Sequence, residues 1–151
     1  MALKSQLVKF WARLRASQLK KQSKNALVCQ EKVFKYLIKE GQKTAFGKDH
    51  NFGQVRSIAD FQNQVPVRDY EQGKDYFDRI VSGEADVTWP DKPLYLAKTS
   101  GTTSGAKYIP ITKASIRRQI ISARDALFLY VAETGNADFF DGKMMFLSGS
   151  P

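Results

Sequence analysis

Residues 99–107 consist of small side chains and one lysine, in the order Thr-Ser-Gly-Thr-Thr-Ser-Gly-Ala-Lys. Glycine loses the most backbone entropy on ordering, and Ser and Thr offer the backbone competing local hydrogen bonds. Neither a helix nor a strand is expected from such a segment, so it is predicted to be a loop. On either side lie short apolar segments typical of strands, at residues 94–98 and 108–111. The sequence therefore predicts two strands joined by a loop rich in Ser, Thr and Gly.

Helical periodicity dominates the chain before these strands. Apolar residues recur every three or four positions over residues 1–24 and again over residues 25–40. The first segment predicts a basic amphipathic helix, and the second predicts a helix that ends at Gly41. Residues 41–54 show no such periodicity and are expected to form a loop.

Three further helices are predicted from their capping residues. Ser57 followed by Asp60 predicts a capping box for a short helix. Asp69 is expected to be the N-cap of a helix ending near Gly83, and Thr112 the N-cap of a long helix. The residues predicted to face inward on these helices are Ile58, Phe61, Tyr70, Phe77, Ile80, Val81, Ile116, Ile120, Ala123, Leu127, Phe128 and Val131.

The order of these elements predicts a mixed α/β fold, with N-terminal helices followed by the first strands of a larger sheet domain. Residues 144–147 are a candidate third strand, and the sequence ends at Pro151. Because two or three strands are a small platform for a long helix, we expect the chain to be truncated. The expected organisation is a basic helix at residues 1–24 and the N-terminal part of one domain at residues 25–151.

Composition excludes several classes of protein. With 42% hydrophobic and 26% charged residues, the 151-residue chain is neither disordered nor fibrous. One cysteine and one histidine exclude an internal disulfide, a His/Cys zinc site and Cys–His catalysis. The longest apolar run, residues 126–132, is far shorter than the roughly 20 residues of a spanning helix. No secretory signal is apparent, so a cytoplasmic protein is expected.

The formal net charge of +9 is concentrated near the N-terminus. Residues 1–48 hold 12 of the 24 Lys and Arg residues but only two of the 15 acidic residues. The remainder is close to neutral, which differs from an evenly basic nucleic-acid groove, and no nucleic-acid partner is expected.

Residues 1–27 carry seven basic residues and no acidic residue. Their apolar residues at helical spacing are Leu3, Leu7, Phe10, Trp11 and Leu14. We expect these to pack on the domain while the basic residues face solvent. The alternatives are contact of this helix with an anionic membrane surface and a mitochondrial presequence.

The loop at residues 99–107 has the chemistry of an anion cradle. Its hydroxyl groups and successive backbone N–H groups can donate hydrogen bonds to phosphate oxygens. Glycines at positions 101 and 105 allow the backbone to approach a ligand closely, and Lys107 adds a positive charge. A flexible hairpin loop with solvent-exposed hydroxyls is the alternative.

The loop is not a Walker A motif. That motif has four residues between its glycines and a Lys-Ser or Lys-Thr pair directly after the second glycine. Here three residues separate the glycines, Ala106 precedes the lysine and Tyr108 follows it.

The loop and its flanking segments carry a family resemblance. Residues 98–107 resemble the phosphate-binding loop of adenylate-forming enzymes. Several other segments then follow in the order of a narrower group: residues 44–47, 61–67, 69–71, 83–84 and 108–112. Together they resemble the N-terminal part of the auxin-responsive promoter family of acyl-acid amido synthetases, from about residue 30 to residue 151.

The resemblance implies an ATP-dependent ligase that converts a carboxylic acid into its acyl-adenylate and then transfers the acyl group to an amine or amino acid. Mg²⁺ would neutralise the departing pyrophosphate. The residues implied to bind the β- and γ-phosphates of ATP are Ser100, Gly101, Thr102, Thr103, Ser104, Gly105 and Lys107. Superfamily loops often have proline where Ala106 stands, and this difference is expected to loosen the loop.

In this family the adenine and Mg²⁺ motifs, the acyl-acid pocket and the mobile C-terminal domain lie beyond the stretch represented here. No catalytic residue and no metal ligand is therefore assigned, and the chain alone is expected to be inactive. The alternative hypothesis is a truncated, inactive remnant that binds anions or a partner through its basic N-terminus.

Other reactive side chains are given structural roles. His50 has no visible nucleophile or partner, and Cys29 is expected to be a small buried residue of a helix. Four acidic residues, expected to face solvent rather than bind a metal, are Asp69, Glu71, Asp75 and Asp78.

Overall fold

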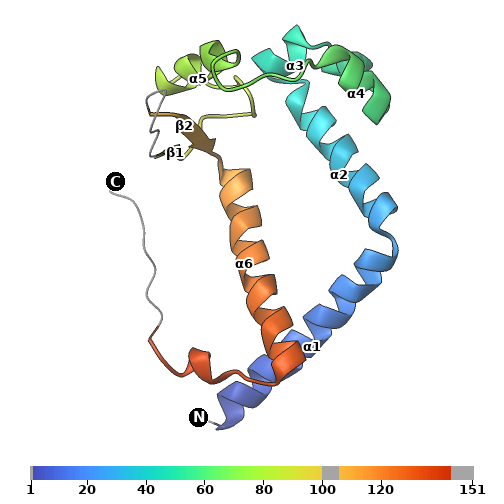
Figure 1. Cartoon of the computed structure of the whole chain (residues 1–151), viewed down its shortest axis with the longest axis vertical. Coiled ribbons are helices and arrows are strands. Elements are labelled where there is room, and N and C mark those ends of the chain that lie inside the picture. The colour runs from blue at the N-terminus through green and yellow to red at the C-terminus, as the bar shows by residue number, and fades with distance from the viewer. Residues whose placement is uncertain (1, 100–105, 144–151) are drawn as a thin grey trace. The chain divides into compact units, whose positions relative to one another are not determined.

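The computed structural model describes residues 2–99 and 106–143 (Figure 1). Its helices are α1 (Ala2–Lys24), α2 (Ala26–Gly41), α3 (Ala45–Asp49), α4 (Ile58–Gln64), α5 (Lys74–Val81) and α6 (Lys113–Thr134), with 3-10 turns η1 (Phe52–Gln54) and η2 (Asp138–Phe140). The strands are β1 (Tyr95–Lys98) and β2 (Tyr108–Ile111). This order confirms the mixed α/β prediction. The expected strand at residues 144–147 lies outside the described residues.

The chain divides into two compact units, one made of residues 1–27 and 117–151, the other of residues 28–116. Each unit has its own small apolar core. None of the described helices is long and apolar enough to cross a membrane.

The core of the first unit lies where α1 packs on the C-terminal part of α6 and on η2. Ala12, Val131 and Ala137 are almost fully buried. The apolar residues packed around them are Val8, Phe128, Ala132, Phe139 and Phe140. An alanine at the centre of the α1 face leaves room for the larger side chains of α6 and η2.

The prediction that the apolar stripe of α1 packs on the domain is wrong for the described chain. The exposed fractions of its members are 74% for Leu3, 54% for Leu7, 57% for Phe10, 59% for Trp11 and 42% for Leu14. The inward face of α1 instead carries Val8, Ala12 and Arg15, which are spaced by four and three residues. On this face Arg15 binds Asp125 of α6.

The second unit has a core rich in aromatic residues, formed by α2, α3, η1 and α4. Ile38, Phe52 and Val55 are buried at its centre. The residues packed around them are Phe34, Phe46, Phe61 and Val65. Phe52 meets the rings of Phe46 and Phe61 at centroid distances of 5.8 Å.

The prediction of a loop over residues 41–54 is wrong, because α3 and η1 occupy this segment. Thr44 is the N-cap of α3: its Oγ1 accepts a hydrogen bond from Gly47 N at 3.0 Å and donates one to Gly41 O at 2.7 Å. The Thr44 side chain is fully buried. A five-residue helix is too short to show apolar periodicity, so only its cap could have revealed it.

The capping box of α4 is confirmed. Asp60 N donates to Ser57 Oγ at 3.1 Å, and Ser57 N donates to Asp60 Oδ2 at 2.9 Å. The backbone N–H of Arg56 donates to the same carboxylate, and these bonds lower the pKa of Asp60.

The predicted start of α5 at Asp69 is wrong, whereas its predicted end near Gly83 is confirmed. Asp69 Oδ1 accepts a hydrogen bond from Gln72 N at 2.8 Å, and Gln72 Oε1 accepts one from Asp69 N at 2.9 Å. These two bonds close a turn, and α5 begins only after Gly73. Gly83 has φ +91°, a left-handed conformation that glycine adopts without strain.

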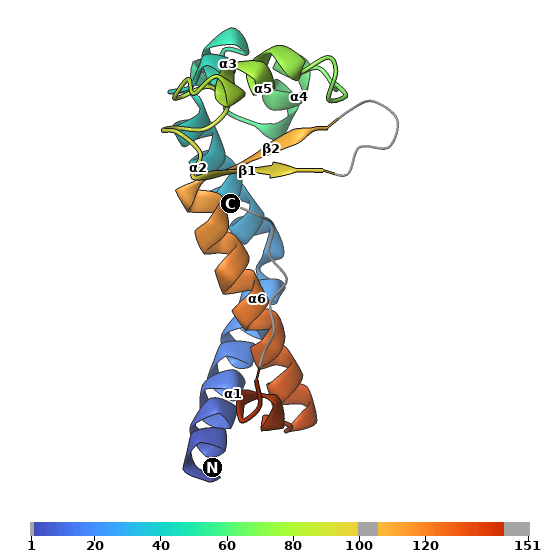
Figure 2. The ribbon, with the colours of Figure 1, turned by 90° about the vertical axis from the view of Figure 1, so that its left-hand side faces the viewer.

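The two predicted strands are confirmed as an antiparallel hairpin, visible in side view in Figure 2. Tyr95 pairs with Ile111, and Lys98 pairs with Tyr108. The long helix α6 begins directly after β2, as Thr112 predicts: Ser115 N donates to Thr112 Oγ1 at 3.1 Å.

The predicted inward face of α6 is wrong in part. Val131 is buried, but Ile120 is 64% exposed and Leu127 is 38% exposed. Asp125, which no apolar pattern selects, is buried instead.

Candidate functional site

The candidate site lies at the end of the β1–β2 hairpin where β1 ends and β2 begins. Thr99 N donates a hydrogen bond to Lys107 O at 3.0 Å, which extends the strand ladder by one pair. Six of the seven predicted phosphate-binding residues, at positions 100–105, lie outside the described residues. The seventh, Lys107, is described: it lies opposite Thr99, the residue directly after β1.

Lys107 points its ammonium group toward an aromatic ring. Its Nζ lies 5.4 Å from the centroid of the Tyr70 ring, within the range of a cation–π interaction. The lysine is half-buried, and among residues 2–99 and 106–143 no carboxylate forms an ion pair with it. The cation is therefore held in place but its charge is not neutralised, which suits binding of an anion.

Tyr70 also contacts the backbone beside Lys107. Its phenol oxygen accepts a hydrogen bond from Tyr108 N at 3.0 Å. Its ring stacks on Phe77 of α5, with centroids 4.6 Å apart and planes 15° apart. The turn before α5 thus fixes Tyr70, and Tyr70 contacts the start of β2.

From its sequence, Tyr70 is predicted only to face inward, and its contacts with Lys107 and Tyr108 are not predicted. No spacing relates position 70 to position 108. The one available indication is chemical, since a partly buried tyrosine hydroxyl usually finds a hydrogen-bond partner.

The other reactive candidates take structural positions. His50 is 5% exposed, stacks on Phe46 with centroids 4.1 Å apart, and has its Nδ1 2.8 Å from Phe46 O. Asp78 pairs with Lys74 at 2.7 Å on the exposed face of α5. The prediction of a buried Cys29 is wrong, because its exposure is intermediate. The described residues contain no group of three or more His, Cys, Asp or Glu that could hold a metal ion.

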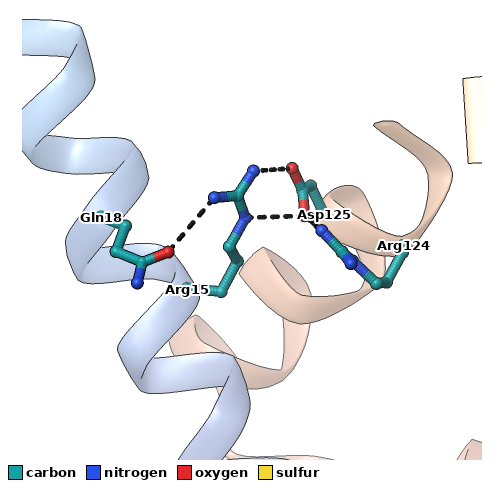
Figure 3. A network of polar contacts seen from close by, with 4 residues as sticks. All are labelled: Arg15, Gln18, Arg124 and Asp125. Atoms are coloured by element: carbon teal, nitrogen blue, oxygen red, sulfur yellow. Dashed lines mark hydrogen bonds and ion pairs between the residues drawn. The ribbon is translucent and has the colours of Figure 1, made fainter. Parts of the chain in front are cut away.

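A second charged cluster lies in the first unit, between α1 and α6 (Figure 3). Arg15 donates two hydrogen bonds to Asp125, from Nε to Oδ1 at 2.9 Å and from Nη2 to Oδ2 at 2.6 Å. Arg124 donates to Oδ1 at 2.9 Å, and Gln18 accepts from Arg15 at 3.2 Å. Hydrogen bonding from Arg15, then from Arg124, lowers the pKa of Asp125 to about 2.

This cluster is a structural clamp between two helices. The Asp125 carboxylate accepts hydrogen bonds from two guanidinium groups. Its pairing with Arg15 is bidentate, which is the stronger arrangement of an arginine–carboxylate pair. All four residues of the cluster are hydrogen-bonded to one another, so the cluster is not proposed as a ligand site.

Comparisons with known proteins give one family and one curated relative. Residues 15–151 match the model of the GH3 family N-terminal domain. Over 98 residues the chain is 32% identical to the indole-3-acetic acid-amido synthetase GH3.15 of Arabidopsis thaliana, covering 64% of this chain and 16% of that protein. The chain therefore spans about one sixth of the length of that relative. No solved structure matches.

Proposed function

Because the chain belongs to the GH3 family, we propose that it is the N-terminal part of an ATP-dependent acyl-acid amido synthetase. In this proposal the parent enzyme activates a carboxylic acid as its acyl-adenylate and transfers the acyl group to an amine or amino acid. The name of the Arabidopsis relative, an amido synthetase, supports the reaction class. A cytoplasmic location is part of the proposal.

The observation that carries the proposal is the uncompensated cation at the end of the hairpin. Lys107 lies against Tyr70 rather than against a carboxylate, at the boundary of a segment rich in Ser, Thr and Gly. In the proposed reaction, negative charge builds up on the pyrophosphate as it leaves ATP. A fixed positive charge and donors beside the β- and γ-phosphates would stabilise that transition state.

The proposed phosphate-binding set is the one the family resemblance implies: Ser100, Gly101, Thr102, Thr103, Ser104, Gly105 and Lys107. Mg²⁺, when bound, would supply additional charge neutralisation for pyrophosphate. We assign no Mg²⁺ ligand in this chain.

Replacing Lys107 tests the phosphate role. In the full-length parent, Lys107→Ala should lower kcat/KM for ATP by roughly 10- to 100-fold, because a donor to the developing charge is lost. The measurement is acid-dependent exchange of pyrophosphate into ATP. The 151-residue chain alone should show no exchange.

Lys98→Ala is the matched control, since it removes the same charge from the opposite strand of the hairpin, where Lys98 pairs with Tyr108. Its rate should stay within about twofold of wild type. An unchanged exchange rate in Lys107→Ala, or an equal loss of rate in both variants, would contradict a phosphate-binding role for Lys107.

A second candidate function is favoured by the surface of α1. Five large apolar residues are exposed on α1, and residues 1–27 of the chain contain seven basic residues and no acidic residue. An amphipathic helix of this kind binds anionic membrane surfaces through apolar insertion and charge attraction. In this alternative the chain binds acidic lipid and has no catalytic role.

Sedimentation with vesicles distinguishes this alternative. It predicts binding to vesicles containing phosphatidylserine, with loss of binding in high salt. Leu7→Ser with Trp11→Ser should abolish that binding while leaving the inward residues Val8 and Ala12 intact. The control is Leu27→Ser, at a position that is 80% exposed. Equal sedimentation with neutral vesicles, or no loss in the double variant, would exclude the alternative.

A further inference from the structure

We propose that Tyr70 is a positioning residue for Lys107, holding its ammonium group at the end of the hairpin in readiness for a phosphate. This inference rests on the proposed function, because it takes Lys107 to be a phosphate ligand.

Tyr70 makes two separate contacts with the Lys107–Tyr108 pair. The face of its ring attracts the Lys107 ammonium group, 5.4 Å from the ring centroid. Its hydroxyl accepts the hydrogen bond of Tyr108 N at 3.0 Å and so fixes the backbone directly after the lysine. One side chain therefore restrains both the main chain and the side-chain end of the same segment.

Tyr70 is itself restrained from the opposite side. Its ring stacks on Phe77, and the reciprocal hydrogen bonds between Asp69 and Gln72 close the turn in which it lies. The Tyr70 side chain is consequently restrained by its own turn and by Phe77. Both are distant in sequence from the hairpin.

The physical reason for such a device is the flexibility of lysine. A lysine side chain loses substantial rotamer entropy when it is fixed on a ligand, and partial ordering beforehand reduces that loss. A cation–π contact is suited to this purpose because it leaves the three N–H donors able to turn to an anion. A carboxylate in the same place would neutralise the charge and compete with the phosphate.

The test is a double-mutant cycle on the 151-residue chain, with inorganic tripolyphosphate as the probe and calorimetry as the measurement. Tyr70→Leu should weaken binding roughly two- to fivefold in the wild-type background. In the Lys107→Ala background the same substitution should change the affinity by less than about 1.5-fold, since its effect acts through the lysine. Tyr70→Phe retains the ring, so it should weaken tripolyphosphate binding about half as much as Tyr70→Leu does.

Phe77→Leu tests the restraint on Tyr70, because it removes the ring that stacks on Tyr70 without touching Lys107. A second readout is the proton shift of the Lys107 ε-methylene group, which the Tyr70 ring should move upfield. This shift should persist in Tyr70→Phe, become smaller in Phe77→Leu, which lacks the ring that restrains Tyr70, and disappear in Tyr70→Leu. A purely structural role for Tyr70 would not produce that pattern.

The outcomes separate the two proposals. If Lys107→Ala leaves tripolyphosphate affinity unchanged, the phosphate role in the proposed function fails, whereas the ε-methylene shift still reports whether Tyr70 holds the lysine. If Lys107→Ala weakens binding but Tyr70→Leu has the same effect in both backgrounds, the positioning role is overturned and the phosphate role stands. An upfield shift that persists unchanged in Tyr70→Leu would also overturn it.

Discussion

Gly47→Ala should destabilise the second unit by at least about 3 kcal/mol, as measured by urea unfolding. A Cβ at this position would lie 2.0 Å from Gly41 O, 2.6 Å from Gly41 C and 2.9 Å from Gln42 Cα. All three atoms belong to the backbone, so no side chain can rotate away to make room. The clash therefore requires α3 to move away from the end of α2.

The sign of this effect is diagnostic, because helix propensity alone predicts the reverse. Gly47 lies inside α3, where alanine normally stabilises a helix by about 1 kcal/mol relative to glycine. Gly53→Ala is the matched control: a Cβ there would meet nothing within 4 Å. Its free energy of unfolding should stay within about 0.5 kcal/mol of wild type. Equal stability of the two variants would contradict the close packing of α3 on residues 41 and 42.

Asp125→Ala should destabilise the first unit by about 2 to 3 kcal/mol. The substitution leaves Arg15, whose side chain is 24% exposed, without its bidentate partner and removes the acceptor for Arg124. The double variant Arg15→Met/Asp125→Leu should regain most of the lost stability, since apolar pairs often replace a buried ion pair without cost. Glu31→Ala, which breaks a pair with 66% and 61% exposed partners, should change stability by less than about 0.5 kcal/mol.

Acid provides an independent measurement of the same pair. Hydrogen bonding from Arg15 depresses the folded-state pKa of Asp125 from 3.8 to about 2. A depressed pKa adds stability above the unfolded-state value, and that stability is lost as pH falls through the folded-state value. Unfolding measurements should therefore show about 2 kcal/mol lost between roughly pH 5 and pH 2. In Asp125→Asn this component should be absent, whereas components from other acids, such as Asp60 and Glu84, remain in both proteins.

The helices that begin with a capping motif and the two strands of the hairpin could be predicted from the sequence. Ser57 with Asp60 and Thr112 with Ser115 each define the start of a helix through local hydrogen bonds. The hairpin could be predicted because two apolar segments flank residues that cannot extend a strand. In each case the deciding interactions lie within a few residues of each other in sequence.

The direction in which a helix faces could not be predicted in the same way. Apolar periodicity selects Leu7 and Trp11 as the inner face of α1, yet Val8 and Ala12 are the residues that pack. The partners of this face lie far away in the sequence: Asp125, which binds Arg15, is 110 residues away. The contact of Tyr70 with Tyr108 spans 38 residues and is equally invisible to local patterns. The sequence therefore singles out Lys107 as a candidate, but it does not show that Tyr70 lies beside it.

The first unit is made of two segments that lie far apart in the sequence, residues 1–27 and 117–151, and this has a consequence during synthesis. Helix α1 leaves the ribosome before α6, and Asp125 is added 110 residues after Arg15. At about 5–20 residues per second, the interval lasts roughly 5–20 s. During that time Val8 and Ala12 are uncovered together with the apolar stripe on the other face. The nascent α1 is then a basic helix that is apolar on two faces, the kind of segment that holding chaperones bind.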